Sequence, residues 1–255
     1  MKRNRVRPFW VAGAAATAMF SHAALSQAAV YTDTVGDNNG GSVNVDISGA
    51  SVTNDGSNIT FTIDLNPSAD LTSTDASYVH YELALQTGPG GYTTLSNPYS
   101  EQIGVSTGWN YYALGYVYTN NGTAGTPGAD LYSGNSSGYT KITSAFTVTD
   151  VTTGTPSFTI SIPLATLGLS AGSSFNFDAY TTYSGGSQGA YDALDNPTPT
   201  PGTPYTPVTP YDSATASGSQ FGTAAYSYTV SAVPEPASLG LLGFAGVMAM
   251  RRLRK

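Results

Sequence analysis

A two-residue alternation of apolar and polar side chains is the sequence feature that most constrains how this chain folds. Five runs show it, at positions 58–65, 78–85, 157–162, 174–183 and 226–230. Successive side chains of a β-strand point to opposite faces, so this pattern is typical of antiparallel sheets with one buried face. Gly, Asn, Asp and Pro separate the runs, as expected of turns.

Two such sheets can bury their apolar faces against each other. The sequence therefore predicts an all-β fold: a two-sheet antiparallel β-sandwich, jelly-roll or immunoglobulin-like, with eight to ten short strands. One helical turn is expected at positions 163–169, with Pro163 near its start and Gly168 near its end. An N-terminal signal helix and a short C-terminal hydrophobic helix should flank the sandwich.

Positive charge is confined to the two ends of the chain. Eight of the nine Lys and Arg residues lie in the first seven or the last five positions, and Lys141 is the only one between them. Residues 29–233 combine 15 acids with this one base, which gives a formal net charge of −14. Such a body gains no binding energy from phosphates, so we expect no nucleic-acid or anionic membrane partner. Basic ends around a translocated body follow the positive-inside rule.

Residues 1–28 have the three parts of a secretory signal peptide. Four cations lie at positions 2–7, positions 9–20 are apolar, and small residues lead to Ala28. We expect signal peptidase to cut after Ala28, with Ala29 as the second choice. The alternative, a buried N-terminal helix, would leave the four cations without a purpose.

The C-terminus, residues 233–255, has three parts as well. Val233, Pro234, Glu235 and Pro236 precede an apolar segment at 237–250, and a basic end beginning with Arg251 and Arg252 follows. As a helix, the apolar segment would span only about 21 Å. That is short of the ~30 Å hydrocarbon core, so it suits a transient hold at the inner membrane. A plain anchor that is never cut is the alternative.

This ending resembles the PEP-CTERM sorting signal of Gram-negative bacteria. The resemblance rests on the Pro-Glu-Pro triplet, the Gly-rich apolar segment and the basic end. It implies processing by an exosortase, a membrane-embedded transpeptidase-like enzyme. It also implies an exported protein at the cell surface or outside the cell, in a species that makes extracellular polysaccharide.

The body, residues 29–232, includes a Pro-rich stretch at 196–210 that we interpret as an extended loop before the last strand. The body resembles a DOMON or family 9 carbohydrate-binding module. The motifs that carry this resemblance include the opening at 33–37, the turn at 54–56 and the segment at 191–195. The resemblance implies a sugar-binding sandwich, and it assigns no sugar-binding residue.

Catalytic chemistry has little support in the sequence. The chain has no cysteine, and His80 is the only histidine left after signal cleavage. No G-x-S-x-G elbow or H-E-x-x-H motif accompanies it. Glu82 and Glu101 are the only glutamates of the body, and a glycan hydrolase would need two carboxylates ~5–9.5 Å apart. Solvated side chains on a strand and a loop are the simpler interpretation, so we expect no enzyme.

Calcium is the cofactor that the sequence suggests. Asp33, Asp37 and Asp46 cluster near the start of the body, and Asp192 and Asp195 precede the last strand. Ca²⁺ prefers carboxylate, amide and carbonyl oxygens, and a bound cation would relieve the repulsion of an acidic body. The alternative is that these residues only form turns.

Aromatic residues gather at positions 109–118. Tyr112, Leu114, Tyr116 and Tyr118 alternate as one strand face, which favours a buried role. Trp109 stands before that strand, so we predict an exposed loop residue that could stack on a sugar ring.

Together these features predict an exported, non-catalytic surface or extracellular-matrix protein that contacts polysaccharide. Two alternatives remain open. One is an extracellular glycan hydrolase using Glu82 or Glu101, and the other is a structural or adhesive component without a ligand.

Overall fold

The structure is a computed structural model, and it describes residues 28–38, 42–91, 109–117, 126–135, 137–142, 147–151, 155–183, 190–194 and 226–232. These residues all belong to one compact unit, Ser26–Val233. The predicted signal helix, the Pro-rich loop at 196–210 and the C-terminal hydrophobic helix lie outside the described residues. Among the residues described, no helix has the length and apolar character needed to span a membrane.

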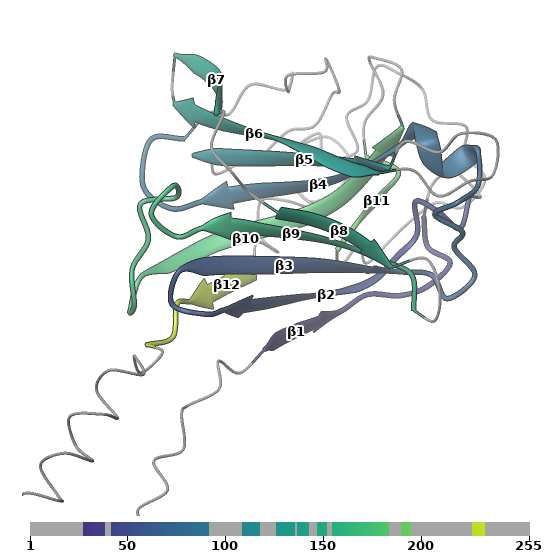
Figure 1. The fold of residues 1–255 in the computed structure, drawn as a ribbon, viewed down its shortest axis with the longest axis horizontal. Helices are drawn as coiled ribbons and strands as arrows, with labels where there is room; N and C mark the ends of the chain where they lie inside the picture. Colours follow the sequence, from purple (N-terminus) through teal and green to yellow (C-terminus); the bar gives the residue numbers. More distant parts are fainter. Residues whose placement is uncertain are drawn as a thin grey trace, which may run out of the picture. The chain divides into compact units, whose positions relative to one another are not determined.

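The described chain forms two antiparallel sheets that pack face to face (Figure 1). Sheet A has five strands, in the order β1 (Ala29–Thr32), β2 (Ile47–Asn54), β3 (Asn58–Leu65), β9 (Ser157–Pro163) and β8 (Thr147–Val151). Sheet B has seven, in the order β11 (Asp192–Ala193), β10 (Ser174–Tyr183), β4 (Val79–Gln86), β5 (Tyr111–Val117), β6 (Pro127–Asn135) and β7 (Gly138–Ile142), with β12 (Tyr226–Thr229) also on β10. The predicted all-β, two-sheet antiparallel fold is confirmed, although the twelve strands of this part of the chain exceed the expected eight to ten.

Alternating side chains build the core between the sheets. On β3, Ile59, Phe61 and Ile63 are buried, and the polar residues between them are half-buried. Tyr81 of sheet B stacks on Phe158 of sheet A, with ring centroids 5.0 Å apart. Side chains from two inner faces therefore interlock, as the period-two pattern of each strand requires.

Close approach of the sheets requires a glycine on β5. A Cβ added at Gly115 would lie 2.1 Å from Cε1 of Phe158 and 2.5 Å from Cζ. Real Cβ contacts are never this short, so the Phe158 ring occupies the space that any larger residue at position 115 would need.

Strand β10 connects the two ends of the sandwich. β12 pairs with its first half, with Ser174 opposite Thr229, and β11 pairs with its second half, with Thr181 opposite Asp192. The rise from Ser174 to Thr181 is about 23 Å at ~3.3 Å per residue. We call the end with Thr229 the junction end and the end with Asp192 the acidic end.

The expected helical turn at 163–169 is present as hydrogen-bonded turns, not as a helix. Leu167 N–H donates to the carbonyl of Leu164, and Gly168 N–H donates to that of Ala165. The one helical element of the described residues is the 3₁₀-helix η1 (Asp75–Tyr78), which the sequence pattern did not predict. Its four residues are too few to show a periodicity.

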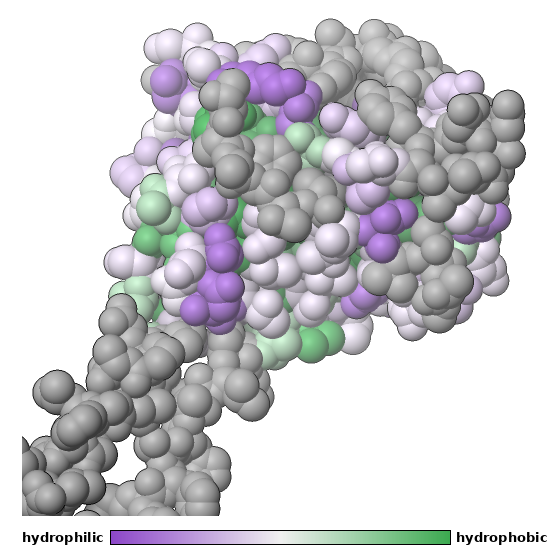
Figure 2. Space-filling view, viewed as in Figure 1, coloured by the Kyte–Doolittle hydropathy of each residue, from purple (hydrophilic) through white to green (hydrophobic). Residues whose placement is uncertain are grey.

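On the face seen in Figure 2, the described residues are mostly pale, which marks intermediate hydropathy. Strongly hydrophilic residues form small separate groups on it. This agrees with a body that has few charged residues and is rich in small hydroxyl and glycine residues.

Candidate functional site

Three carboxylates converge at the acidic end. Asp33 and Asp37 lie in the connection between β1 and β2 of sheet A, and Asp192 begins β11 of sheet B. One carboxylate oxygen from each of the three lies within 4.8 Å of the other two. The fold thus brings together three of the five residues predicted as calcium ligands. Asp195 lies outside the described residues.

Asp46, the remaining predicted ligand, supports the loop that carries Asp37. Its two carboxylate oxygens accept the N–H of Gly36, at 3.1 and 2.9 Å. The side-chain amide of Asn66 donates to the same carboxylate at 2.6 Å. Gly36 has a φ of 90°, a left-handed conformation that residues with a side chain rarely adopt. Asp46 and Gly36 therefore fix the path of the loop.

Burial and mutual repulsion dominate the electrostatics of this cluster. Asp192 is fully buried, and its Oδ2 accepts the N–H of Ile47 at 2.6 Å. Burial, joined by the charges of the nearby aspartates, raises the pKa of Asp192 well above its usual range. Burial, and then the charge of Asp46, raise the pKa of Asp37 to about 6. Both carboxyl groups are therefore costly to ionise where they stand.

One oxygen of Asp37 is left without a partner in this cluster. Asp37 is only 6% exposed, and its buried Oδ1 accepts no hydrogen bond from the described residues. Buried carboxylate oxygens are normally satisfied by donors or by a cation.

The basic residue of the body cannot neutralise the cluster. Lys141 forms an ion pair with Asp130, with Nζ 2.7 Å from Oδ1. It lies on β7, at the opposite edge of sheet B from β11. Five strand spacings separate these edges, about 24 Å at ~4.8 Å per spacing.

A second cluster covers the outer face of sheet B, the face turned away from sheet A. We call it the outer-face cluster, and its buried members are Ala84, Trp109, Tyr112, Leu114, Tyr132, Tyr180, Ala190 and Ala193. The predicted aromatic stripe of β5 is therefore buried, but on the outer face and not in the core between the sheets. Tyr118 lies outside the described residues.

The prediction that Trp109 is exposed was wrong. The residue lies two positions before β5, but its side chain is only 3% exposed. Its ring packs against Tyr112, with centroids 5.4 Å apart. A second apolar cluster outside the main core gives Trp109 a buried position, and no local sequence signal indicates such a cluster.

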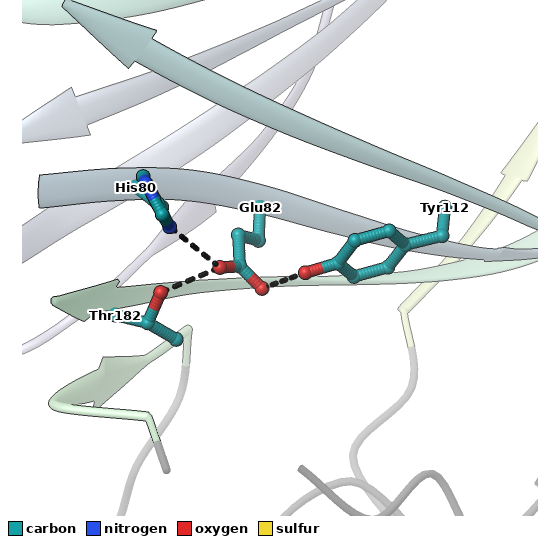
Figure 3. A network of polar contacts seen from close by, with 4 residues as sticks. All are labelled: His80, Glu82, Tyr112 and Thr182. Carbon is teal, nitrogen blue, oxygen red and sulfur yellow. Dashed lines mark hydrogen bonds and ion pairs between the residues drawn. The ribbon is translucent and has the colours of Figure 1, made fainter. Parts of the chain in front are cut away.

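Glu82 is also buried, contrary to the expectation of a solvated side chain. It has no exposed surface, and it lies at the centre of a polar network on the outer face of sheet B (Figure 3). Its Oε2 accepts a hydrogen bond from Tyr112 Oη of β5, and its Oε1 accepts one from Thr182 Oγ1 of β10 at 2.5 Å. His80 Nδ1 lies 3.9 Å from Oε1. The network joins three neighbouring strands.

A second carboxylate lies on the same face as Glu82. Tyr180 of β10 stands opposite Glu82 in the strand register, so Asp178, two residues earlier on β10, is its diagonal neighbour. Diagonal pairs in adjacent strands have Cα atoms about 7–8 Å apart. Asp178 is 3% exposed. Glu101, the partner that the sequence suggested for Glu82, lies outside the described residues.

The outer-face cluster reaches solvent at the edge formed by β6 and β7. Tyr139 of β7 is 39% exposed, and its ring packs against Tyr132 with centroids 5.9 Å apart. Lys141 and Asp130 form their ion pair on the same two strands. This edge therefore presents a partly exposed aromatic ring that is supported by buried rings, with an ion pair on the same two strands.

The first and the last described strands, β1 and β12, contact each other at the junction end. Tyr31 of β1 donates its hydroxyl to the carbonyl of Ser227 at 2.9 Å, and its ring packs against Tyr226 of β12. Asn54, at the end of β2, accepts the N–H of Ser231 at 2.9 Å and donates to its carbonyl at 3.0 Å. The described chain therefore begins and ends on neighbouring strands.

The predicted processing sites flank this region. β1 begins at Ala29, so cleavage after Ala28 would leave every strand residue in place. Cleavage after Ala29 would remove the first residue of β1. The residues of the predicted sorting motif, Val233, Pro234, Glu235, Pro236, Arg251 and Arg252, lie outside the described residues.

Comparison with known families supports the interpretation of the C-terminus. Residues 232–255 match the PEP-CTERM protein-sorting motif. The chain therefore carries this motif and is an exported protein, sorted by an exosortase to the cell envelope or surface. The match concerns the C-terminal segment and says nothing of what the sandwich does. No curated protein matches the chain.

Proposed function

We propose that this protein is a non-catalytic component of the cell surface or extracellular matrix that binds polysaccharide through the outer face of sheet B. In this proposal, signal peptidase removes residues 1–28 and the tail holds the chain briefly at the inner membrane. An exosortase then acts at the Val233–Pro236 segment.

One observation carries the proposal. The sorting motif begins at residue 232, three residues after the last described strand, which ends at Thr229. Loss of the tail from about position 234 would remove none of the described strands. Because β1 and β12 are in contact, both predicted cuts fall at the junction end, and the body would leave the membrane intact.

The polysaccharide site is proposed at the exposed edge of the outer-face cluster. Tyr139 offers a partly exposed ring there, and the Asp130–Lys141 pair offers hydrogen-bonding groups for sugar hydroxyls. Both features lie on β6 and β7 of sheet B, away from the edge that carries β12. A bound polymer would not obstruct the junction end.

Retention of the full chain on immobilised polysaccharides tests this site. We expect wild type to be retained on at least one polymer and Tyr139→Ala to lose about fivefold or more in affinity, since one stacking ring is worth ~1 kcal/mol or more. Tyr78→Ala is the matched control, because Tyr78 is 52% exposed but lies on η1. No retention on any polymer, with or without calcium, would favour a structural component without a ligand.

The intact mass of the protein recovered from cells and from the medium tests the processing. We expect a chain that begins at Ala29 and has lost the residues after about position 234. A single species of full-length mass in both fractions would contradict the proposed cleavages.

The placement of Glu82 and Asp178 favours a second candidate, a glycan hydrolase. Two buried carboxyl groups lie on one face of neighbouring strands, and a pair of acids is what such an enzyme uses. Incubation with soluble glycans, followed by analysis of reducing ends, tests it. Activity that disappears in both Glu82→Gln and Asp178→Asn would establish the enzyme, and activity that survives both would exclude this pair.

A further inference from the structure

We propose that the acidic end of the sandwich binds one calcium ion through carboxylate oxygens of Asp33, Asp37 and Asp192. The ion would connect the β1–β2 segment of sheet A with β11 of sheet B. This site is independent of the proposed polysaccharide site, which lies at the opposite edge of sheet B.

The spacing of the oxygens suits calcium. Ca²⁺ holds its ligands at 2.3–2.6 Å, so two of its ligands can lie up to about 5 Å apart. The three carboxylate oxygens lie within 4.8 Å of one another, so one such ion can contact all three with only a small shift of the side chains. Mg²⁺ demands near-ideal octahedral geometry at about 2.0–2.1 Å and gives up its waters reluctantly, so it is less suited to three carboxylates held in place by the fold.

The burial of Asp37 is the second, independent observation. Its side chain is more than nine-tenths buried, and its Oδ1 accepts no hydrogen bond from the described residues. Asp37 is also one of the three residues whose ligand atoms converge. A buried, unsatisfied carboxylate oxygen beside two other carboxylates is costly unless a cation joins them.

Nothing else in the body can supply that positive charge. Lys141 is the only Lys or Arg between positions 8 and 250, and it is paired with Asp130 at the far edge of the sheet. The four cations of the signal peptide are lost from a processed chain. The cluster must therefore bind a metal ion or take up protons, and the oxygen-only set of ligands favours a hard divalent cation.

Asp46 acts as a positioning residue. It accepts the N–H of Gly36 with both carboxylate oxygens, and this contact holds Asp37, the next residue, in the cluster. Asp192 is fixed in the same way by the N–H groups of Ile47 and Ala193. The ligands are therefore held in place before the ion arrives, which lowers the entropic cost of binding it.

Calorimetric titration of the purified full chain with calcium chloride, after removal of metal with EGTA and dialysis, tests the site. We expect one ion per chain with a Kd of about 1 mM or tighter. We also expect calcium to raise the melting temperature by about 5 °C or more at saturation. Magnesium chloride should bind at least about tenfold more weakly.

Asp37→Asn gives the sharpest comparison. It keeps the shape of the side chain and removes one charge, so in EGTA it should melt at the same temperature as wild type or higher. In calcium its melting temperature should be lower than that of wild type, because its affinity for calcium is about tenfold weaker or more. If Asp37 had a purely structural role, Asp37→Asn would change the melting temperature in the same direction with and without calcium.

Asp70→Asn is the matched control, because Asp70 lies in an exposed turn and its Oδ1 accepts hydrogen bonds that Asn can also accept. Its calcium response should equal that of wild type. The proposal is overturned if 10 mM calcium (about tenfold above the weakest Kd expected) produces neither heat nor a melting shift. It is also overturned if Asp37→Asn and Asp70→Asn respond alike.

If Asp37→Asn does not fold, the metal content of the wild-type chain decides the question. After equilibrium dialysis against about 1 mM calcium, elemental analysis should find about 0.5 ions per chain at the weakest expected Kd, and close to one ion if binding is much tighter. Fewer than 0.2 ions per chain, as a rough threshold, would refute the site. None of these measurements depends on sorting or on polysaccharide, so their failure would leave the proposed function untouched.

Discussion

Asn54 is the residue that fastens the end of the sandwich to its body, so Asn54→Ala should loosen the last strand selectively. The side chain is 3% exposed. Its Oδ1 accepts from Ser231 N–H at 2.9 Å and from the Tyr228 hydroxyl at 2.8 Å, and its amide donates to the Ser231 carbonyl at 3.0 Å. Alanine removes all three hydrogen bonds.

Each of these bonds is worth about 1 kcal/mol net, and water can replace part of the loss at the half-exposed Ser231. We therefore expect the free energy that keeps β12 closed to fall by about 2–3 kcal/mol. This strand pairs with β10 over only four residues, so the loss should appear as local opening before global unfolding. Since 1.4 kcal/mol is a factor of ten, the opening equilibrium should rise about 30- to 150-fold.

Hydrogen exchange followed by mass spectrometry measures this opening directly. The informative amide is that of Val230, which donates to the Ser173 carbonyl at 2.9 Å. Asn58→Ala is the control, since Asn58 Nδ2 makes one long contact, 3.3 Å, with the exposed Asp55. Exchange at Val230 that changes less than about threefold in Asn54→Ala, or equally in both variants, would refute this account of the junction end.

Three further predictions concern the body. Gly115→Ala should destabilise the protein by about 1–3 kcal/mol, because the new Cβ overlaps the ring of Phe158; Gly88→Ala, with no atom within 4 Å of the added Cβ, is the control in urea denaturation. Glu82→Ala should cost about 3 kcal/mol in the same assay, since it removes the hydrogen bonds that two buried hydroxyl groups donate to this carboxylate, and a change under ~1 kcal/mol would contradict the network. Two backbone N–H groups of its own turn donate to Asp55 and lower its pKa below 3.8, so the stability that Asp55 contributes is present above pH 3.8 and is lost as the pH falls further. Asp55→Asn should therefore lose less stability in acid than wild type does, and identical acid unfolding curves for the two proteins would argue against this.

The strands with a clear period of two could be predicted from the sequence. The runs at 58–65, 157–162 and 174–183 are strands β3, β9 and β10, because each buries one face in the sandwich core. Strand β6 was missed. Its sequence, PGADLYSGN, begins with Pro-Gly and has only two buried residues, so it shows no period-two pattern. Pairing with the neighbouring strands β5 and β7 stabilises this strand, and the local sequence does not reveal that pairing.

The candidate sites divide in the same way. Asp33, Asp37 and Asp192 were predicted as calcium ligands because their segments are acidic and the body has almost no cations, but only the fold shows that the two segments meet. The burial of Glu82 and Trp109 could not be predicted, because period two indicates which residues share a face and not whether a second cluster covers that face. Only the strand register shows that Glu82 stands between Leu114 and Tyr180.

Contact between β1 and β12 also determines when the domain can finish folding. Tyr228 and Val230 are buried in the core, and they come only a few residues before the membrane-directed tail. For a chain exported in unfolded form, we therefore expect the core to close only after almost the entire body has crossed the membrane. Its folding should be completed when β12 pairs with β10 on the far side.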